Sequence, residues 1–247
     1  MSQARKKIIT GSFTRYCKSY NDNADIQRIT AKSLIELLPT ISKPRVLEIG
    51  CGTGILTEAL MKEYPEGVFE ITDISDVMLE ECKKRLQRSK TTFYLMDGEN
   101  PVDNLGTYDL VVSSMTLHWF LKPYEATMRL SKLGPFFYST IGPDNFYEWQ
   151  RCLHKVGAAN SAFPIQKIPG ELKQEYHQVQ CESFATFAKE LRKTGAMALH
   201  GTQIKPSLRL LNLALDEFSK SHKKISWHIT FGCIQQKNYP NFSNRVS

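Results

Sequence analysis

Residues 46–54 read VLEIGCGTG, an apolar run that ends in three glycines at alternate positions, Gly50, Gly52 and Gly54. A nearly continuous apolar run of this length is typical of a strand buried on both faces of a parallel sheet. The glycines allow a sharp turn and a close approach of a ligand to the backbone, and a following helix offers free N–H groups to that ligand. The stretch therefore predicts a strand, a ligand-binding turn and a helix, in that order.

Strands and helices alternate on either side of this turn. An amphipathic helix is predicted over residues 24–38, and Pro39 ends it. Further strands are predicted over 45–50, 67–75, 91–97, 108–115 and 134–142, and helices over 55–64 and 76–88. This alternation predicts right-handed crossovers and a doubly wound α/β sheet, mostly parallel, that binds its ligand at the carboxyl ends of the strands.

The pattern is weaker after residue 142. A sixth strand is predicted over 176–184, a helix over 184–197 and a last strand over 225–236. The expected organisation is a single domain, residues 1–247. It divides into an N-terminal helical cover (1–40), a cofactor-binding core (44–142), a substrate lid with the sixth strand (143–224) and the last strand (225–237).

Composition excludes several classes of protein. The chain is 41% apolar and 23% charged, which is ordinary for a globular protein, and it contains no apolar run long enough for a membrane span. Its start lacks the pattern of a secretory leader, so we expect a soluble, cytoplasmic protein that contacts no membrane. We also expect a monomer. Six cysteines are widely spaced without a C-x-x-C pair, which argues against a zinc site or a disulfide framework, and we expect no metal.

Two departures from phosphate-binding motifs narrow the class of ligand that the glycine turn can bind. Ile55 stands where the dinucleotide motif G-x-G-x-x-G requires its third glycine, and no Gly-Lys-Ser/Thr follows as in a P-loop. Asp73 ends the next predicted strand, where a carboxylate can accept hydrogen bonds from both hydroxyls of a ribose. The combination indicates an adenosine without phosphates.

With Glu48 inside the strand, residues 46–54 resemble the first motif of class I S-adenosylmethionine-dependent methyltransferases, and Asp73 matches the acidic residue of their second motif. The resemblance implies a Rossmann-like sheet with an antiparallel last strand, an N-terminal helical cover, a helical lid insertion, and S-adenosyl-L-methionine as cofactor. It places Asp97 against the adenine, and Ser114 with Met115 at the methionine end. The cofactor-binding set that it implies is Glu48, Gly50, Cys51, Gly52, Gly54, Asp73, Ile74, Met78, Asp97, Gly98, Ser114 and Met115.

A narrower resemblance begins before the first strand. Residues 12–39, SFTRYCKSYNDNADIQRITAKSLIELLP, resemble the opening of malonyl-acyl-carrier-protein O-methyltransferases, the BioC family of biotin synthesis, and the similarity recurs in 113–120, 191–201 and 225–236. The reaction that it implies is methylation of the free carboxylate of malonyl-acyl-carrier protein, or of malonyl-CoA, to a methyl ester. Ser114 replaces a residue that is often Asn in the family, and the connection before the fifth strand is shorter than usual.

This reaction needs alignment more than acid or base help, because a carboxylate is already ionised at neutral pH. No general base is therefore expected, and Tyr20 and Trp119 are predicted to position the reactants. The residues predicted to bind substrate or carrier are Phe13, Arg15, Gln27, Arg192 and Lys193.

The formal charge of +7 is compatible with an acidic protein, a nucleic acid or an anionic membrane as partner. An acidic acyl carrier protein would meet a basic rim made of Lys189, Arg192, Lys193, Lys205 and Arg209. No nucleic acid is expected, because SSMT stands after the fourth strand in place of a base-methyltransferase motif. Three alternatives stay open: a methyltransferase for another small carboxylate or a quinone precursor, a nucleic-acid methyltransferase, and a non-methylating assembly factor with the same fold.

Overall fold

The computed structural model describes residues 3–158, 167–194 and 207–236, with side chains from residue 7 onward. The strands are β1 (Arg45–Ile49), β2 (Val68–Asp73), β3 (Thr91–Leu95), β4 (Leu110–Ser114), β5 (Phe136–Ile141), β6 (Glu171–Gln180) and β7 (Lys224–Ile234). The α-helices are α1 (Gln3–Tyr20), α2 (Asp25–Ile35), α3 (Ile55–Glu63), α4 (Asp76–Leu86), α5 (Pro123–Leu130), α6 (Tyr147–Lys155), α7 (Phe184–Arg192) and α8 (Leu208–Ser221). Two short 3-10 helices are η1 (Asn21–Asn23) and η2 (Leu117–Trp119).

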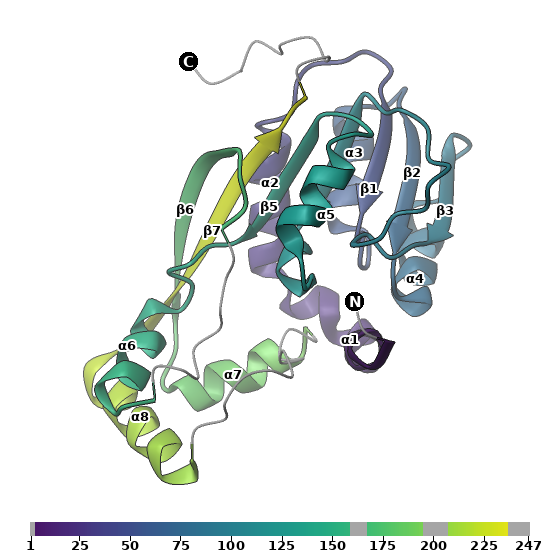
Figure 1. The fold of residues 1–247 in the computed structure, drawn as a ribbon. Helices are drawn as coiled ribbons and strands as arrows, with labels where there is room; N and C mark the ends of the chain where they lie inside the picture. The colour runs from purple at the N-terminus through teal and green to yellow at the C-terminus, as the bar shows by residue number, and fades with distance from the viewer. Residues whose placement is uncertain (1–2, 159–166, 195–206, 237–247) are drawn as a thin grey trace.

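The strands form one sheet in the order β3-β2-β1-β4-β5-β7-β6 (Figure 1). Pairing is parallel from β3 across to β5, whereas β7 pairs antiparallel with both β5 and β6. The predicted doubly wound sheet with an antiparallel last strand is thereby confirmed. Because the order reverses beside β1, the carboxyl ends of β1 and β4 diverge there and leave space for a ligand.

Both faces of the central parallel strands β1 and β4 are apolar and covered, as in a parallel sheet. Val46 and Val112 belong to the core on the side of α2, α3 and α4, and their neighbours Leu47 and Val111 belong to the core on the side of α5. Figure 1 shows α5 in front of the sheet and α2 and α3 behind it. The continuous apolar runs of β1 and β4 therefore serve two cores at once, since successive side chains in a strand point to opposite faces.

Several element ends differ from the sequence prediction: α7, for example, ends at Arg192 rather than at residue 197. α2 ends at Ile35 rather than at residue 38, and Ile29, expected on its apolar face, is 44% exposed. The sixth strand begins at Glu171 and ends at Gln180, so the predicted range 176–184 was wrong at both ends. β6 is an edge strand with polar residues on both faces. Its bounds therefore follow from backbone pairing with β7 and not from an alternation of apolar and polar side chains.

Helices α6, α7 and α8 form a separate layer at the lower left of Figure 1, packed on the start of β7. Their contact is aromatic. The rings of Trp149 and Phe184 stack at 3.9 Å between centroids, and Phe146 meets Trp227 of β7 edge to face at 4.6 Å. This cluster fixes α7 relative to the sheet, so that its C-terminal end points towards α1 (Figure 1).

Helix α1 packs against α4 at the carboxyl ends of the strands and is joined to the end of α7, because Ser19 Oγ donates a hydrogen bond of 3.0 Å to the Lys193 carbonyl oxygen. Within the described residues, no helix is long and apolar enough to cross a membrane. Helices α1 and α7 together cover the end of the sheet at which the sequence predicts the ligand.

Candidate functional site

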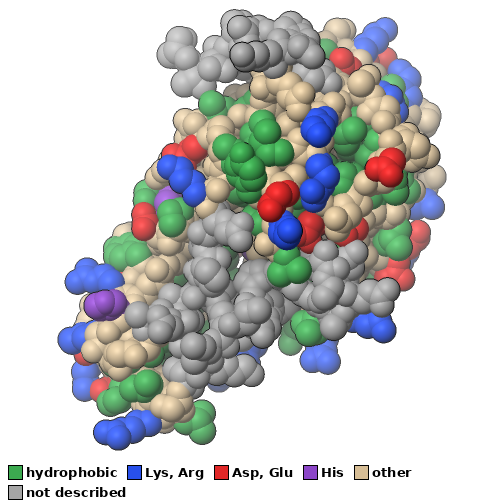
Figure 2. Space-filling view, viewed as in Figure 1, with side chains coloured by type: hydrophobic (Ala, Val, Ile, Leu, Met, Phe, Trp, Pro, Cys, Tyr) green, Lys and Arg blue, Asp and Glu red, His purple; other side chains and the backbone are tan. Residues whose placement is uncertain are grey.

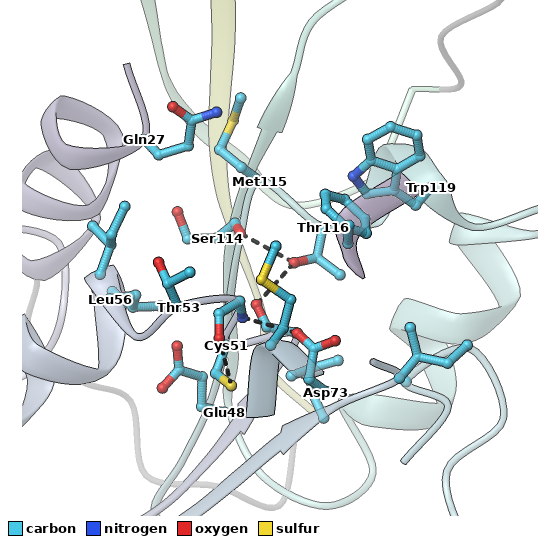
Figure 3. Close-up of a pocket in the computed structure, with 18 of the residues that line it drawn as sticks. Gln27, Glu48, Cys51, Thr53, Leu56, Asp73, Ser114, Met115, Thr116 and Trp119 are labelled. Carbon is cyan, nitrogen blue, oxygen red and sulfur yellow. Dashed lines mark hydrogen bonds between the residues drawn. The ribbon is translucent and has the colours of Figure 1, made fainter. Parts of the chain in front are cut away.

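A pocket with an open volume of about 1120 Å³ lies under α1, at the carboxyl ends of β1, β2 and β4. A cleft of this size at a topological switch point is typical of a cofactor site. The structure brings the following predicted site residues together in its lining: Phe13, Tyr20, Gln27, Glu48, Gly50, Cys51, Gly52, Asp73, Ile74, Met78, Asp97, Gly98, Ser114, Met115 and Trp119. Figure 3 shows several of them converging from both sides of the pocket.

The glycine turn has the left-handed backbone that its sequence suggests. Gly50, Gly52 and Gly54 have φ angles of 73°, 54° and 91°. A Cβ atom on Gly50 would lie 2.4 Å from Thr116 Oγ1, and one on Gly54 would lie 2.8 Å from Cys82 Sγ. Gly54 does not line the pocket but stands at the N-cap of α3. Glycine is therefore needed at positions 50 and 54 for close packing as well as for conformation.

Asp73 links this turn to the end of β2 by hydrogen bonds. Its Oδ2 accepts a 2.8 Å hydrogen bond from the Gly52 N–H, and its Oδ1 accepts one of 2.8 Å from the Ser75 N–H. Burial raises the pKa of this carboxyl group above its ordinary value, and the N–H donors oppose that shift. A carboxylate can accept about four hydrogen bonds, so Asp73 can also accept hydrogen bonds from the hydroxyls of a ribose.

Glu48 is buried at the base of the pocket, where it is 1% exposed. Its Oε2 accepts a hydrogen bond of 2.7 Å from the Thr57 hydroxyl. Burial raises the pKa of the Glu48 carboxyl group well above its ordinary value, because the charged form loses its hydration. The shift favours the neutral acid, so Glu48 adds less negative charge to the pocket than the sequence alone suggests.

The loop after β3 lies flat against β1. Asp97 Oδ1 accepts a 3.1 Å hydrogen bond from the Glu99 N–H, and Oδ2 accepts one of 2.8 Å from the Asn100 side chain. A Cβ atom on Gly98 would lie 2.3 Å from Ile49 Cγ2. The loop is thus held in one conformation that brings Asp97 to the pocket, and its contact with adenine stays a prediction.

The end of β4 contains a strained residue. Met115 has a φ of 53°, an uncommon left-handed conformation for a residue with a side chain, and such strain is concentrated at functional sites. Next to it, Thr116 Oγ1 donates to the Gly50 carbonyl oxygen at 3.3 Å and to the Ser114 carbonyl oxygen at 3.1 Å (Figure 3). The Ser114 hydroxyl bonds that of Ser139 at 2.9 Å. Sequence reasoning missed Thr116, although it directly follows the predicted strand end that faces the glycine turn.

The cover supplies the opposite wall. Tyr20, the last residue of α1, lines the pocket, and burial together with the nearby Asp73 charge raises the pKa of its hydroxyl group. Phe13 meets Trp119 edge to face at 5.4 Å between ring centroids. Gln27 Oε1 is buried against the pocket and accepts no hydrogen bond within the described part of the chain. A bound ligand with a donor at this point would satisfy it.

Other predicted residues lie elsewhere. Arg15, Arg192 and Lys193 are exposed and do not line the pocket, and the Lys193 side chain pairs with Glu190 at 2.6 Å. Lys205 of the predicted basic rim is outside the described residues. Among those that are described, the pocket lining contains no Lys or Arg. A positive clamp for phosphates is therefore absent from this part of the site, in agreement with an adenosine ligand that lacks them.

Several further lining residues were not predicted, among them Thr53, Thr194 and Trp227. The Thr53 hydroxyl donates a 2.6 Å hydrogen bond to Asn21 Oδ1, which ties the glycine turn to η1. Thr194 and Trp227 reach the pocket from the end of α7 and from β7. No local sequence signal marks the last two, because their place depends on how the helical layer packs on the sheet.

Comparisons with known proteins agree with this geometry. A methyltransferase-domain family model matches residues 46–132, the stretch that contains the glycine turn, Asp73 and Met115. Among solved structures, the chain resembles YcgJ of Bacillus subtilis (TM-score 0.55, 14% identity, 84% of this chain and 99% of that one). It also resembles magnesium protoporphyrin IX methyltransferase of Synechocystis with bound S-adenosylhomocysteine (TM-score 0.51, 16% identity, 92% and 97%). At these identities the likeness establishes the fold.

Curated relatives are more similar in sequence. The malonyl-[acyl-carrier protein] O-methyltransferase of Magnetococcus marinus is 32% identical over 236 residues, which cover 87% of each chain. The corresponding enzyme of Priestia megaterium is 31% identical over 66% of this chain and 63% of that one. The biotin biosynthesis bifunctional protein BioCD of Bordetella avium is 28% identical over 92% of this chain but only 52% of its own length. The chain is an S-adenosylmethionine-dependent class I methyltransferase and belongs to the malonyl-acyl-carrier-protein O-methyltransferase family.

Proposed function

We propose that this enzyme methylates the free carboxylate of a malonyl thioester carried by acyl carrier protein, and that it acts in biotin synthesis. The observation that carries the proposal is the 32% identity over 87% of both chains to a relative with this activity in its name. The character of the pocket supports it, because a wall without Lys or Arg among the described residues suits the chemistry of this reaction.

When bound, S-adenosylmethionine supplies a methyl group on a positively charged sulfur. Transfer to a carboxylate converts an anion and a cation into a neutral ester and a neutral thioether, so charge disappears as the transition state forms. An apolar, dry pocket stabilises such a transition state relative to the separated ions, whereas a tight ion pair with Arg would stabilise the ground state. No base is needed, since the carboxylate is ionised at neutral pH.

The residues of the pocket would position the cofactor and the acceptor relative to each other. Asp73 and the glycine turn would hold the adenosine, and the strained Met115 would set the depth of the methionine end. Tyr20 of α1 and Trp119 of η2, which both line the pocket, would orient the acceptor carboxylate through uncharged side chains. In the same proposal, residues 1–40 are the cover and 143–224 the lid of a single domain.

The test is transfer of label from methyl-labelled S-adenosylmethionine to malonyl-acyl-carrier protein, malonyl-CoA, acetyl-acyl-carrier protein and bulk RNA. We expect label in the malonyl thioesters alone, released by mild alkali as methanol, because the product is a methyl ester. Acetyl-acyl-carrier protein is the matched control, since it lacks only the free carboxylate. Label in RNA, or equal label in the acetyl and malonyl thioesters, would contradict the proposal.

Trp119→Leu and Phe120→Leu form a matched pair of variants. Both rings line the pocket, but Phe120 is buried in the core cluster on the side of α5, whereas Trp119 contacts Phe13 of the cover. If Trp119 orients the acceptor, its substitution lowers kcat on malonyl-acyl-carrier protein at least tenfold with little change in the Kd for S-adenosylhomocysteine. Equal kinetic effects of the two variants would remove this role from Trp119.

A further inference from the structure

The net surplus of positive charge in the chain is concentrated in two helical segments. Helix α1, residues 3–20, contains five basic residues and no acidic one, and residues 184–193, which are α7 and its C-cap, contain three basic residues and one acidic. Together these two segments hold eight basic residues and one acidic, whereas the rest of the chain holds 24 of each sign. The whole surplus of +7 therefore lies in 28 residues.

These two segments are neighbours at the mouth of the pocket. Phe13 and Tyr20 of α1 line the pocket, and so does Thr194, which directly follows the second segment. The Ser19 hydroxyl bonds the Lys193 carbonyl oxygen at 3.0 Å and joins them. We call residues 3–20 and 184–193 the basic mouth.

The cations of the basic mouth are available to a partner. The exposed ones with no ion pair among the described residues are Lys7, Arg15, Lys18, Lys189 and Arg192. The adjacent helix α4 does not neutralise them, because it carries three acidic and three basic residues. Figure 2 shows Lys and Arg side chains at the lower edge of the molecule, where Figure 1 places α1.

The pocket itself does not use these charges. Its described lining contains no Lys or Arg, so the surplus lies outside the space in which a small substrate reacts. Exposed charges on a surface around a mouth act over about a Debye length, roughly 10 Å at 0.1 M salt, and attract a partner that is itself large and acidic. A membrane is a poor fit, because Ile9 and Cys17 of α1 are buried and leave no broad apolar face to insert.

We propose that the basic mouth is the docking surface for an acidic acyl carrier protein, whose thioester arm enters the pocket between α1 and the end of α7. This inference rests on the proposed function and adds where the carrier binds. It also changes the composition of the predicted rim: α1 supplies most of the charge, whereas Arg209 lies on α8, which contributes no residue to the described pocket lining.

The test compares two triple variants of equal charge change. Lys7→Glu/Lys18→Glu/Lys189→Glu alters the basic mouth. Lys43→Glu/Lys90→Glu/Lys132→Glu alters exposed lysines that precede β1, β3 and β5 at the opposite edge of the sheet. For each protein, kcat/KM is measured on malonyl-acyl-carrier protein and on malonyl-pantetheine, which has the arm but no carrier, at about 0.05 and 0.5 M salt.

We expect the basic-mouth variant to lower the ratio of the two kcat/KM values, carrier over pantetheine, at least tenfold at low salt and much less at high salt. The control variant should leave this ratio within about twofold of wild type. A ratio that is the same in both variants would overturn the docking proposal while the proposed function stands. If the wild-type enzyme methylates neither thioester, both proposals fail.

Binding to other polyanions is measured alongside, with phosphatidylserine vesicles and with RNA. Loss of vesicle or RNA binding in the basic-mouth variant, with an unchanged ratio for the two thioesters, would assign the surface to that other partner and overturn the proposal. Circular dichroism and affinity for S-adenosylhomocysteine verify that each variant is folded.

Discussion

Asp73→Ala is the substitution that most directly tests the cofactor site. The carboxylate already accepts hydrogen bonds from the Gly52 and Ser75 N–H groups, and we expect it to accept hydrogen bonds from the ribose hydroxyls as well. A hydrogen bond to a charged group contributes about 1.5–3 kcal/mol, and 1.4 kcal/mol corresponds to a factor of ten in Kd. Loss of both bonds, partly replaced by water, should raise the Kd for S-adenosylhomocysteine at least tenfold, as measured by titration calorimetry.

The same substitution also releases Gly52 from β2, so lower affinity alone does not prove a ribose contact. A cofactor analogue that lacks the ribose 2′-hydroxyl separates the two effects. Wild-type enzyme should bind S-adenosylhomocysteine more tightly than this analogue, and Asp73→Ala should bind the two almost equally. If the variant discriminates between them as well as wild type does, Asp73 does not bind the ribose and the reasoning is refuted. Asp109→Ala is the control, because Asp109 accepts the Arg45 N–H at 2.7 Å on the opposite edge of the sheet.

The pH dependence of binding has a definite sign. Burial raises the pKa of Asp73 above its ordinary value of 3.8, and only the ionised form accepts a hydrogen bond at all four positions. Affinity should therefore fall on acidification, starting at a higher pH than for an exposed aspartate. Asp73→Asn should remove this fall, and an unchanged pH profile in that variant would assign the titration to another group.

Three further predictions concern stability, measured by urea unfolding. Gly54→Ala should lower the free energy of unfolding by about 1–3 kcal/mol, because φ is 91° and the new Cβ would lie 2.8 Å from a sulfur atom, whereas Gly52→Ala, with a φ of 54° and no atom within 4 Å, should cost less. Folding raises the pKa of the Glu48 carboxyl group, so the free energy of unfolding of the wild-type protein should decrease as pH rises from about 4.5 through the pKa of the folded state. Glu48→Gln should make the free energy of unfolding depend less on pH, and an equal pH dependence in both proteins would contradict the raised pKa. Glu148→Ala should lower the free energy of unfolding by about 2–4 kcal/mol, because the buried N–H and hydroxyl of Ser226 donate to Glu148 at 3.0 and 2.6 Å and would lose their acceptor.

The parallel half of the fold could be predicted because its signals are local. A strand buried on both faces must be apolar throughout, and the turn that follows β1 must contain glycine at positions 50 and 54, so the amino-acid sequence reports both directly. The sequence of β6 contains no such local signal, because this edge strand is held by backbone pairing with β7 and its side chains can be polar. Its start at Glu171 was missed for this reason.

The candidate site divides in the same way. Asp73 could be identified from the order of elements, and Met115 from the resemblance to class I methyltransferases, because both lie at the ends of strands in the parallel half. Thr194 and Trp227 could not, because they reach the pocket only through the aromatic packing that sets α7 on the sheet. Arg15 and Arg192 were predicted to bind substrate or carrier, and the structure places both on the surface, outside the pocket lining.

The position of these cations follows from the chemistry of the reaction that we propose. A cation inside the pocket would hold the carboxylate by a strong ion pair, and that interaction would be lost as the methyl group arrives and the negative charge disappears. Outside the pocket the same cation attracts the whole carrier and has no such cost, because the carrier keeps its charge throughout the reaction. An interior without Lys or Arg among its described residues and a basic mouth therefore divide recognition into two parts: long-range charge selects the carrier, and short-range uncharged side chains orient the carboxylate. Introducing Arg at Gln27, which lines the pocket, should on this argument lower the KM for malonyl-pantetheine but also lower kcat. A rise in kcat would show that the interior needs positive charge.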